Sequence, residues 1–160
     1  MDRHLVILTA ASAPSLATAP DVMAEMGITD PGVTAGMTTL ISQASAVIMS
    51  AIGRTIIKET VKEEIWPDQF CRSIRLSRTP IITITSIVED GVVLGDDDFR
   101  AEKGSGILHR LAPAGHTVPW CATKLEITYE GGLDPASIPA DLQRACISLT
   151  KLAYSASTRD

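Results

Sequence analysis

Aromatic side chains are scarce in this sequence, and their scarcity limits the kind of core it can build. Only 4% of the 160 residues are aromatic while 45% are hydrophobic, so aliphatic side chains must fill the interior. Basic residues are not in excess either: 14 Lys and Arg stand against 19 Asp and Glu, for a net charge of -5. A sequence-independent grip on nucleic acid requires a basic surface, and this balance argues against one. Length and composition suit one soluble domain spanning residues 1–160.

Residue patterns for catalysis or metal binding are also missing. The cysteines are odd in number and lack metal spacing, so we expect free thiols in a reducing compartment; they are Cys71, Cys121 and Cys146. His109 and His116 match no standard zinc pattern with Cys121. The glycines of 104–106 do not precede a helix, as a phosphate-binding loop requires, and no G-x-S-x-G motif is present. The sequence therefore predicts no enzyme activity, no metal and no cofactor.

Charge is absent from the whole stretch between Asp30 and Arg54. Its apolar residues recur at the i, i+3, i+4 and i+7 spacing of a helix; they are Met37, Leu40, Ile41, Ala44, Val47, Ile48, Ala51 and Ile52. The Thr34 hydroxyl can cap the first turn, and Gly53 can end the helix in the left-handed conformation. We therefore predict one long helix from Val33 to Gly53 as the centre of the fold.

The other face of this predicted helix carries hydroxyl and amide groups but no Lys or Glu. A helix that faces only water usually carries charges, so we expect this face to be covered. Either the rest of the domain or a neighbouring subunit can cover it, because both use the same packing physics. The subunit-interface hypothesis rests on Thr38, Ser42, Ser45 and Met49. A membrane span is the third alternative: the stretch is long enough, but it holds too many hydroxyls.

Shorter helices and an extended segment are predicted near the two ends of the chain. The short apolar run from Leu5 to Ala11 favours an extended segment that packs on the domain, and a secretory signal is the alternative. A short helix is predicted from Thr18 to Gly27, and a final helix begins around Asp141. The apolar face predicted for this final helix consists of Leu142, Ala145, Cys146, Leu149, Leu152 and Ala153.

The segment between the helical parts has the alternating period of strands. Residues 124–129 alternate cleanly, residues 81–88 are rich in β-branched side chains, and Asp90-Gly91 predicts a tight hairpin turn. Glu59 and Glu63 interrupt the apolar face of a strand that begins near Ile57, so we expect that strand at a sheet edge.

These elements predict an α+β fold. Its helical part is a small bundle over about 18–54 and 138–157, with an inserted antiparallel β-module over about 55–132.

Three consecutive carboxylates, Asp96, Asp97 and Asp98, follow the predicted hairpin. Adjacent residues in a strand-connecting loop cannot all face one ion, and calcium loops space their ligands. We therefore expect a mobile loop tip, or a loop that faces a neighbour or a channel, without a structural metal.

Short motifs follow one another along most of the chain in an order that is more specific than any one of them. They are Leu5-Val-Ile-Leu8, Gly27-Ile28, Leu40-Ile-Ser-Gln-Ala-Ser45, Gly53-Arg54, Leu76-Ser-Arg-Thr-Pro-Ile81, Ile84-Thr-Ser-Ile-Val88, Asp90-Gly91, Gly106-Ile-Leu108 with Arg110, Trp120, Ile127-Thr-Tyr-Glu-Gly-Gly132, Ile138-Pro-Ala-Asp-Leu142 and Tyr154. In this order the chain resembles the head–tail connector (adaptor) proteins of tailed bacteriophages and phage-like gene transfer agents.

The resemblance implies a structural role without catalysis. Such adaptors form a homo-oligomeric ring below the portal protein, usually with twelve copies. The ring extends the DNA channel and docks the next neck or tail protein, a stopper or tail terminator. DNA passes through without sequence-specific binding, and no membrane is involved. The protein would be made in the host cytoplasm and reside in the neck of the virion, between capsid and tail.

The resemblance also implies where the portal is contacted. In relatives the C-terminal helix and tail reach the portal, and the matching positions here are Leu152, Tyr154, Ser157, Arg159 and Asp160. The alternative from a different class is a monomeric, β-rich module with helical flanks that binds a ligand or peptide.

Overall fold

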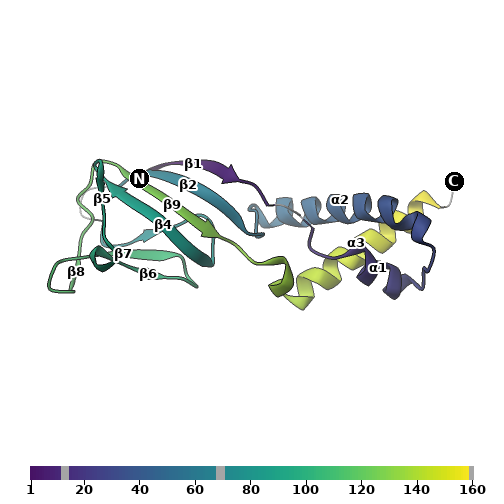
Figure 1. The fold of residues 1–160 in the computed structure, drawn as a ribbon. Coiled ribbons are helices and arrows are strands. Elements are labelled where there is room, and N and C mark those ends of the chain that lie inside the picture. The colour runs from purple at the N-terminus through teal and green to yellow at the C-terminus, as the bar shows by residue number, and fades with distance from the viewer. Residues whose placement is uncertain (12–14, 68–70, 159–160) are drawn as a thin grey trace. The chain divides into compact units, whose positions relative to one another are not determined.

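The computed structural model describes residues 1–11, 15–67 and 71–158, and its contacts divide the chain into two compact units. The β unit comprises Met1–Ala11 and Ile56–Leu133, and the helical unit comprises Ser12–Thr55 and Asp134–Asp160. The predicted α+β class with antiparallel strands is confirmed (Figure 1). That the chain acts as a single domain stays a prediction, and each unit is described by itself below.

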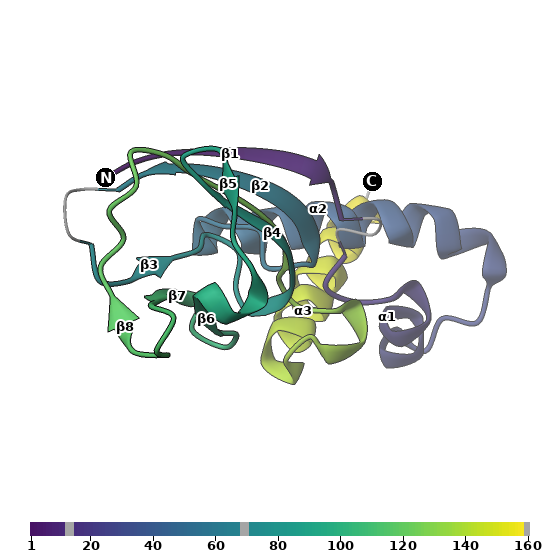
Figure 2. The same cartoon turned by 60° about the vertical axis from the view of Figure 1, so that its left-hand side comes forward.

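The β unit contains two antiparallel sheets (Figure 2). The larger sheet has the order β1 (Asp2–Thr9), β2 (Glu59–Trp66), β9 (Leu125–Gly131), β4 (Ile81–Glu89) and β5 (Val92–Val93). The smaller sheet has the order β3 (Ile74–Arg75), β7 (Ile107–Leu111) and β6 (Phe99–Glu102), with β8 (Thr117–Val118) also paired to β7. The expected extended segment at the start of the chain is therefore a strand that pairs with β2.

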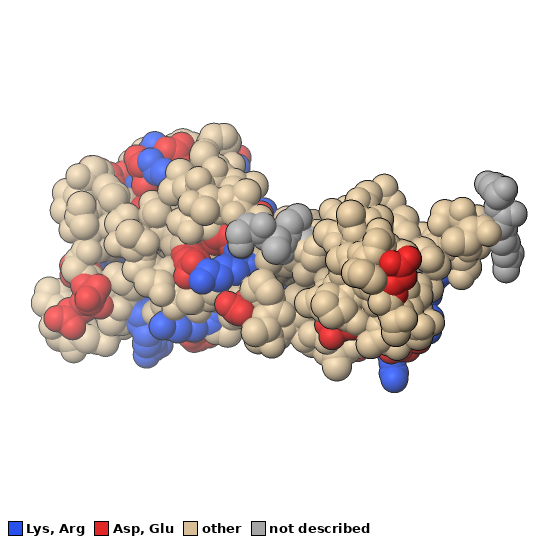
Figure 3. Space-filling model, turned by 45° about the vertical axis from the view of Figure 1, so that its right-hand side comes forward, with Lys and Arg blue, Asp and Glu red and all other residues tan. Residues whose placement is uncertain are grey.

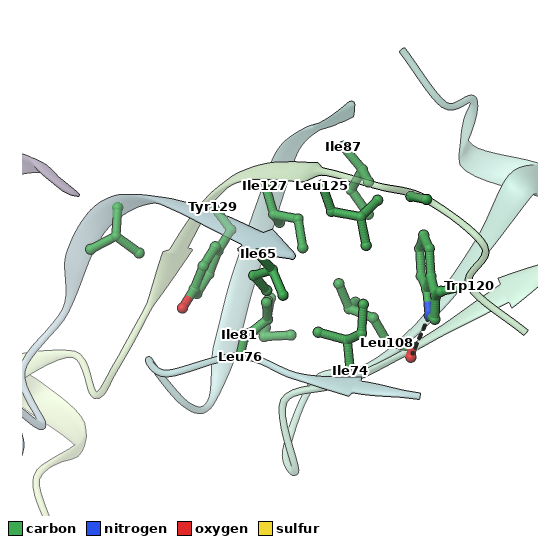
Figure 4. Close-up of a cluster of buried hydrophobic side chains, with 12 residues drawn as sticks. Ile65, Ile74, Leu76, Ile81, Ile87, Leu108, Trp120, Leu125, Ile127 and Tyr129 are labelled. Atoms are coloured by element: carbon green, nitrogen blue, oxygen red, sulfur yellow. Dashed lines mark hydrogen bonds between the residues drawn. The ribbon is translucent and has the colours of Figure 1, made fainter. Parts of the chain in front are cut away.

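Aliphatic side chains fill the core of the β unit, as the lack of aromatic residues requires (Figure 4). Leu125, Ile127 and Tyr129 point inward from β9, so the predicted alternation of this strand is confirmed. Leu108 of β7 belongs to the same cluster, which joins the two sheets through their inner faces. The buried indole of Trp120 donates a hydrogen bond from Nε1 to the Leu108 carbonyl oxygen at 3.4 Å, which satisfies its polar atom.

The β4–β5 turn of the β unit matches its sequence signal, but one strand position does not. Asp90 and Gly91 have φ values of 46° and 86° and join β4 to β5 in the predicted hairpin. The strand that carries Glu59 and Glu63 was expected at an edge, and this is wrong. β2 lies between β1 and β9, and both carboxylates point inward, where arginines compensate their charge.

The helical unit contains α1 (Ala19–Met26), α2 (Thr34–Ile52) and α3 (Ala140–Ser157), with one-turn helices η1 (Pro31–Val33) and η3 (Pro135–Ser137) before the longer two. Gly53 ends α2 with φ 74°, as predicted. The predicted cap at Thr34 is wrong: α2 continues directly from η1, Val33 precedes it without a side-chain cap, and the Thr34 hydroxyl contacts the Met23 sulfur instead.

The core of the helical unit lies along one face of α2. Met37, Ile41 and Ile48 are buried there, together with Val22 of α1 and Cys146 of α3. The segment Pro31–Ile52 is long and apolar enough to span a membrane by length and composition, but the core helix of a soluble protein has the same properties. Because α2 packs on α1 and α3 through its large apolar residues, it serves as the core helix of this unit.

Gly132 has a backbone conformation that only glycine adopts without strain. Its φ is 115°, and an added Cβ would lie 2.6 Å from the Ile57 carbonyl oxygen. We expect Gly132→Ala to lower the free energy of unfolding by about 3 kcal/mol or more, because positive φ and a backbone clash add together.

Gly115→Ala is the matched control for Gly132→Ala. Gly115 also has positive φ, 78°, but an added Cβ there would meet no atom within 4 Å. We expect a cost of about 1 kcal/mol for this change. Urea unfolding of both variants measures the difference, and equal costs would contradict the close packing at Gly132.

Candidate interaction surfaces

One side of α2 is exposed and carries no charged side chain along its 19 residues. Thr38 and Ser42 are exposed on this side, whereas Val47, which keeps 60% of its surface accessible, lies nine residues from Thr38 and so on the opposite side of the helix. The Thr38 hydroxyl donates back to the Thr34 carbonyl oxygen at 2.9 Å, and the Thr39 hydroxyl donates to Ala35 at 3.2 Å. These hydroxyls are therefore already satisfied by the helix itself, and the face can be covered at little polar cost.

Ser45 does not belong to this exposed face, so its prediction as a subunit-interface residue is wrong. It is fully buried within its own chain: its hydroxyl donates to the Ile41 carbonyl oxygen at 2.7 Å and accepts from the Leu16 amide at 2.9 Å. The Cys146 sulfur lies 3.4 Å from the Ser45 hydroxyl oxygen. Met49 is half-buried at the margin of the face, while Thr38 and Ser42 remain available to a neighbour.

α3 is rotated relative to the apolar face predicted for it. Cys146 and Thr150 are its buried residues, whereas Leu149 and Leu152 are 37% and 69% exposed. Thr150 can be buried because its hydroxyl donates to the Cys146 carbonyl oxygen at 2.8 Å. The rotation leaves an apolar stripe on the outside of the helical unit, which we name the α3 outer stripe; it consists of Ala145, Leu149 and Ala153.

The end of α3 holds the residues predicted to contact the portal. Leu152 and Ser157 are exposed and Tyr154 is half-buried. The Ser157 hydroxyl donates to the Tyr154 carbonyl oxygen at 2.8 Å, so it closes the last turn of the helix. Arg159 and Asp160 lie outside the described residues. Contact with the portal stays a prediction for all five positions.

The three aspartates form a one-turn helix, η2 (Asp96–Asp98), before β6. The Asp98 carboxylate accepts from the Gly95 amide at 2.9 Å and from the Arg110 guanidinium at 3.2 Å, and these bonds hold its pKa below the usual value. Asp96 and Asp97 are exposed. Within the described residues, no group of three potential ligands could hold a metal ion. That the outer two aspartates face a neighbour or a channel stays a prediction.

Two buried carboxylates in β2 form a network that sequence reasoning missed. Glu63 is fully buried; it accepts hydrogen bonds from the Tyr129 hydroxyl and, at 2.7 Å, from the Ser77 amide, and Arg3 lies 3.2 Å away. Glu59 pairs with Arg78 at 2.8 Å. Burial, followed by the neighbouring Glu63, raises the pKa of Tyr129. The only sequence signal for this network is the placement of both glutamates on the inward face of one strand.

The Arg3 guanidinium also ties β1 to the rest of the β unit. It donates to the Ser77 hydroxyl at 2.9 Å and to the Arg75 carbonyl oxygen at 2.7 Å, in addition to its pair with Glu63. These groups bond to one another and to the backbone. The network is therefore structural, and it offers no reacting group to a substrate.

A ladder of opposite charges covers the outer face of the large sheet. Lys124 bonds to Glu64 and Glu126, both at 3.0 Å, and Lys62 pairs with the same two carboxylates. Hydrogen bonds from Lys124 and Lys62 lower the pKa values of Glu64 and Glu126, respectively. These cations are neutralised within the chain. In Figure 3, charges of both signs gather on the β unit, whereas much of the visible helical unit is uncharged.

Internally paired charges and a helical unit with exposed, uncharged faces are together typical of a structural assembly protein. A family model for head completion proteins matches residues 15–158. The chain belongs to this family, which confirms the resemblance found in the sequence and the prediction of a structural protein without enzyme activity.

Solved structures of gene transfer agent (GTA) particles contain chains with the same fold. A chain in the neck of an empty GTA particle, computed with C6 symmetry, has a TM-score of 0.67 and 18% identity, covering 95% of this chain and 84% of that chain. A chain in the neck of a native GTA particle, computed with C12 symmetry, has a TM-score of 0.65 and 17% identity, with 95% and 83% covered.

A chain in the virion of a native GTA particle also aligns, with a TM-score of 0.66 and 16% identity over 94% of this chain and 84% of that one. At these identities the likeness concerns the fold. No curated protein sequence matches the chain.

The Arg3 network yields a stability test. We expect Arg3→Met to lower the free energy of unfolding by about 3 kcal/mol, because it leaves the buried Glu63 charge without its cation. Lys58→Met is the matched control, since Lys58 pairs with Glu130 at 3.0 Å on the exposed face, where about 0–1 kcal/mol is expected. Chemical denaturation measures both, and a loss at Arg3 no larger than at Lys58 would show that Glu63 does not depend on this pair.

Proposed function

We propose that this protein is a head–tail connector (adaptor) in the neck of a phage-like particle. Copies of the chain form a ring below the portal protein, extend the DNA channel and dock the next neck or tail protein, a stopper or tail terminator. The family assignment and the shared fold with chains in GTA necks support this role. The C6 and C12 symmetries of those necks support a ring of twelve copies.

The exposed, uncharged face of α2 is the observation that carries the proposal. A solvated helix usually bears charges on its outer face, and this one bears none in 19 residues. Thr38 and Ser42 have small side chains, and the Thr38 hydroxyl already has a hydrogen-bond partner in the helix. A second backbone can therefore approach this face closely. In a ring this face is buried against a neighbouring copy.

The charge distribution suits a channel through which DNA moves without being held. The chain has a net charge of -5, and several of its cations are already engaged by carboxylates; these include Arg78, Arg110 and Lys124. Phosphates are retained by unpaired basic groups, and their retention weakens as those groups are neutralised. We place Asp96 and Asp97 toward a neighbour or the channel, where their charge repels the DNA backbone.

The C-terminal end of α3 is the proposed contact with the portal. Leu152 supplies exposed apolar surface there, and Tyr154 and Ser157 lie in the following turn. Arg159 and Asp160 complete the segment in the proposal. Tyrosine and arginine side chains supply much of the energy of such contacts, so Tyr154 and Arg159 are the main anchors in this proposal.

A charge placed on the α2 face tests ring formation. Ser42→Glu should abolish incorporation of the protein into particles, because a carboxylate would be desolvated without a partner. Ser42→Ala should assemble as the wild type does. Electron microscopy and immunodetection of purified particles measure incorporation, and circular dichroism checks that both variants fold. Normal incorporation of the glutamate variant would contradict a buried α2 face.

The portal contact is tested separately by truncation. Deleting residues 155–160 should leave the thermal midpoint of the isolated protein nearly unchanged, because Ser155 and Ser157 are exposed. The same deletion should weaken binding to portal-bearing capsids. Cosedimentation with capsids that carry or lack the portal measures this; binding of unchanged affinity would show that the tail is not the anchor.

A further inference from the structure

The exposed large apolar side chains of the helical unit lie on only two helices within the described residues. They are Val47 and Ile52 on α2, and Leu149 and Leu152 on α3. Other large apolar residues of α2, such as Met37, Ile41 and Ile48, pack inside the unit. Both helices therefore leave apolar surface uncovered.

The two uncovered faces lie on different sides of the helix pair. α2 and α3 meet at Ser45 and Cys146, where the hydroxyl oxygen and the sulfur are 3.4 Å apart. Thr38, Ser42 and Ala46 lie on the side of α2 that is not buried in this contact. Leu149 likewise lies outside the buried face of α3. One copy thus offers two different surfaces that cannot cover each other within the same chain.

A closed ring of identical copies needs such a pair of surfaces. Its interfaces are heterologous, so one patch on each copy must fit a different patch on the next copy. The α2 face is lined by small side chains, and the α3 outer stripe presents Leu149 between two alanines. A large side chain between small ones can pack into the gaps between small side chains on a facing helix.

We propose that the α3 outer stripe of one copy packs on the exposed α2 face of the next copy around the ring. This deepens the proposed function and rests on it. The residues named for the α2 face and the α3 outer stripe are all uncharged, so pairing them buries no ion. For the same reason they offer nothing to a phosphate or to a charged peptide. The nearest charge on the same row of α3 is the exposed Asp141, one turn before Ala145. The C6 and C12 symmetries of the GTA necks that contain this fold favour a second copy of this chain as the occupant of each face.

The size of the contact indicates when it forms. A helix of 19 residues is about 28 Å long and about 10 Å wide, so one helix face covers about 280 Å². A stable pair of proteins buries about 800 Å² on each partner. This contact is too small to hold two free copies together. The contact instead stabilises copies that the portal protein has already placed side by side in a ring.

Mixing two defective variants tests the pairing directly. Ala46→Glu charges the α2 face and Leu149→Lys charges the α3 outer stripe. Each alone should reduce incorporation into particles at least about tenfold, because an unpaired charge would be desolvated at every interface. An equal mixture should restore incorporation: alternating copies put the new carboxylate against the new ammonium and leave every other interface native.

The possible outcomes separate this inference from the proposed function. Single variants that fail and a mixture that assembles support the pairing. Single variants that fail and a mixture that also fails overturn the pairing, while a ring with a buried α2 face still stands. Single variants that assemble normally overturn both. Ala114→Glu, at an exposed alanine of the β unit, is the control for added charge. Light scattering of the wild-type protein without a portal should find monomers, because the contact is too small to hold free copies together.

Discussion

The packing of α2 against α3 decides which surfaces this protein offers to others. The two helices meet through Ser45 and Cys146, and the Ser45 hydroxyl also binds the Leu16 amide. This contact buries one face of α2 and rotates α3 so that Leu149 turns outward. Apolar surface stays exposed because the buried faces of α2 and α3 are fixed by these polar contacts. In the proposed ring, neighbouring copies cover this surface on both sides.

The β unit differs, because several of its charged side chains are paired within the chain. Inward-pointing Glu59 and Glu63 are matched by Arg78 and Arg3, and the outer face of the large sheet is covered by alternating Lys and Glu. These cations are therefore not available to a polyanion. In the proposed channel this arrangement would be favourable, since a lining that bound phosphate would retard the DNA.

Several features of the fold could be predicted because they depend on neighbours in the sequence. The end of α2 at Gly53, the hairpin at Asp90-Gly91 and the alternation of β9 are local properties of the chain.

The rotation of α3 could not be predicted in the same way. Thr150 and Ser45 donate to carbonyl oxygens four residues earlier, so both polar side chains are buried without an unpaired hydroxyl. Long-range pairing accounts for the other failures. Glu63 indicated an edge strand only because its partners, Arg3 and Tyr129, are far away in the sequence. The absence of charge from α2 can be read from the sequence. The exposure of Leu149 cannot, because it follows from the packing of α3 on α2.

A structure of the assembled neck by electron cryomicroscopy tests the central claim most directly. The account predicts a ring of this chain below the portal, with Thr38, Ser42 and Ala46 of each copy covered by α3 of its neighbour. Exposure of Thr38, Ser42 and Ala46 to solvent or to the DNA channel in the assembled particle would contradict it.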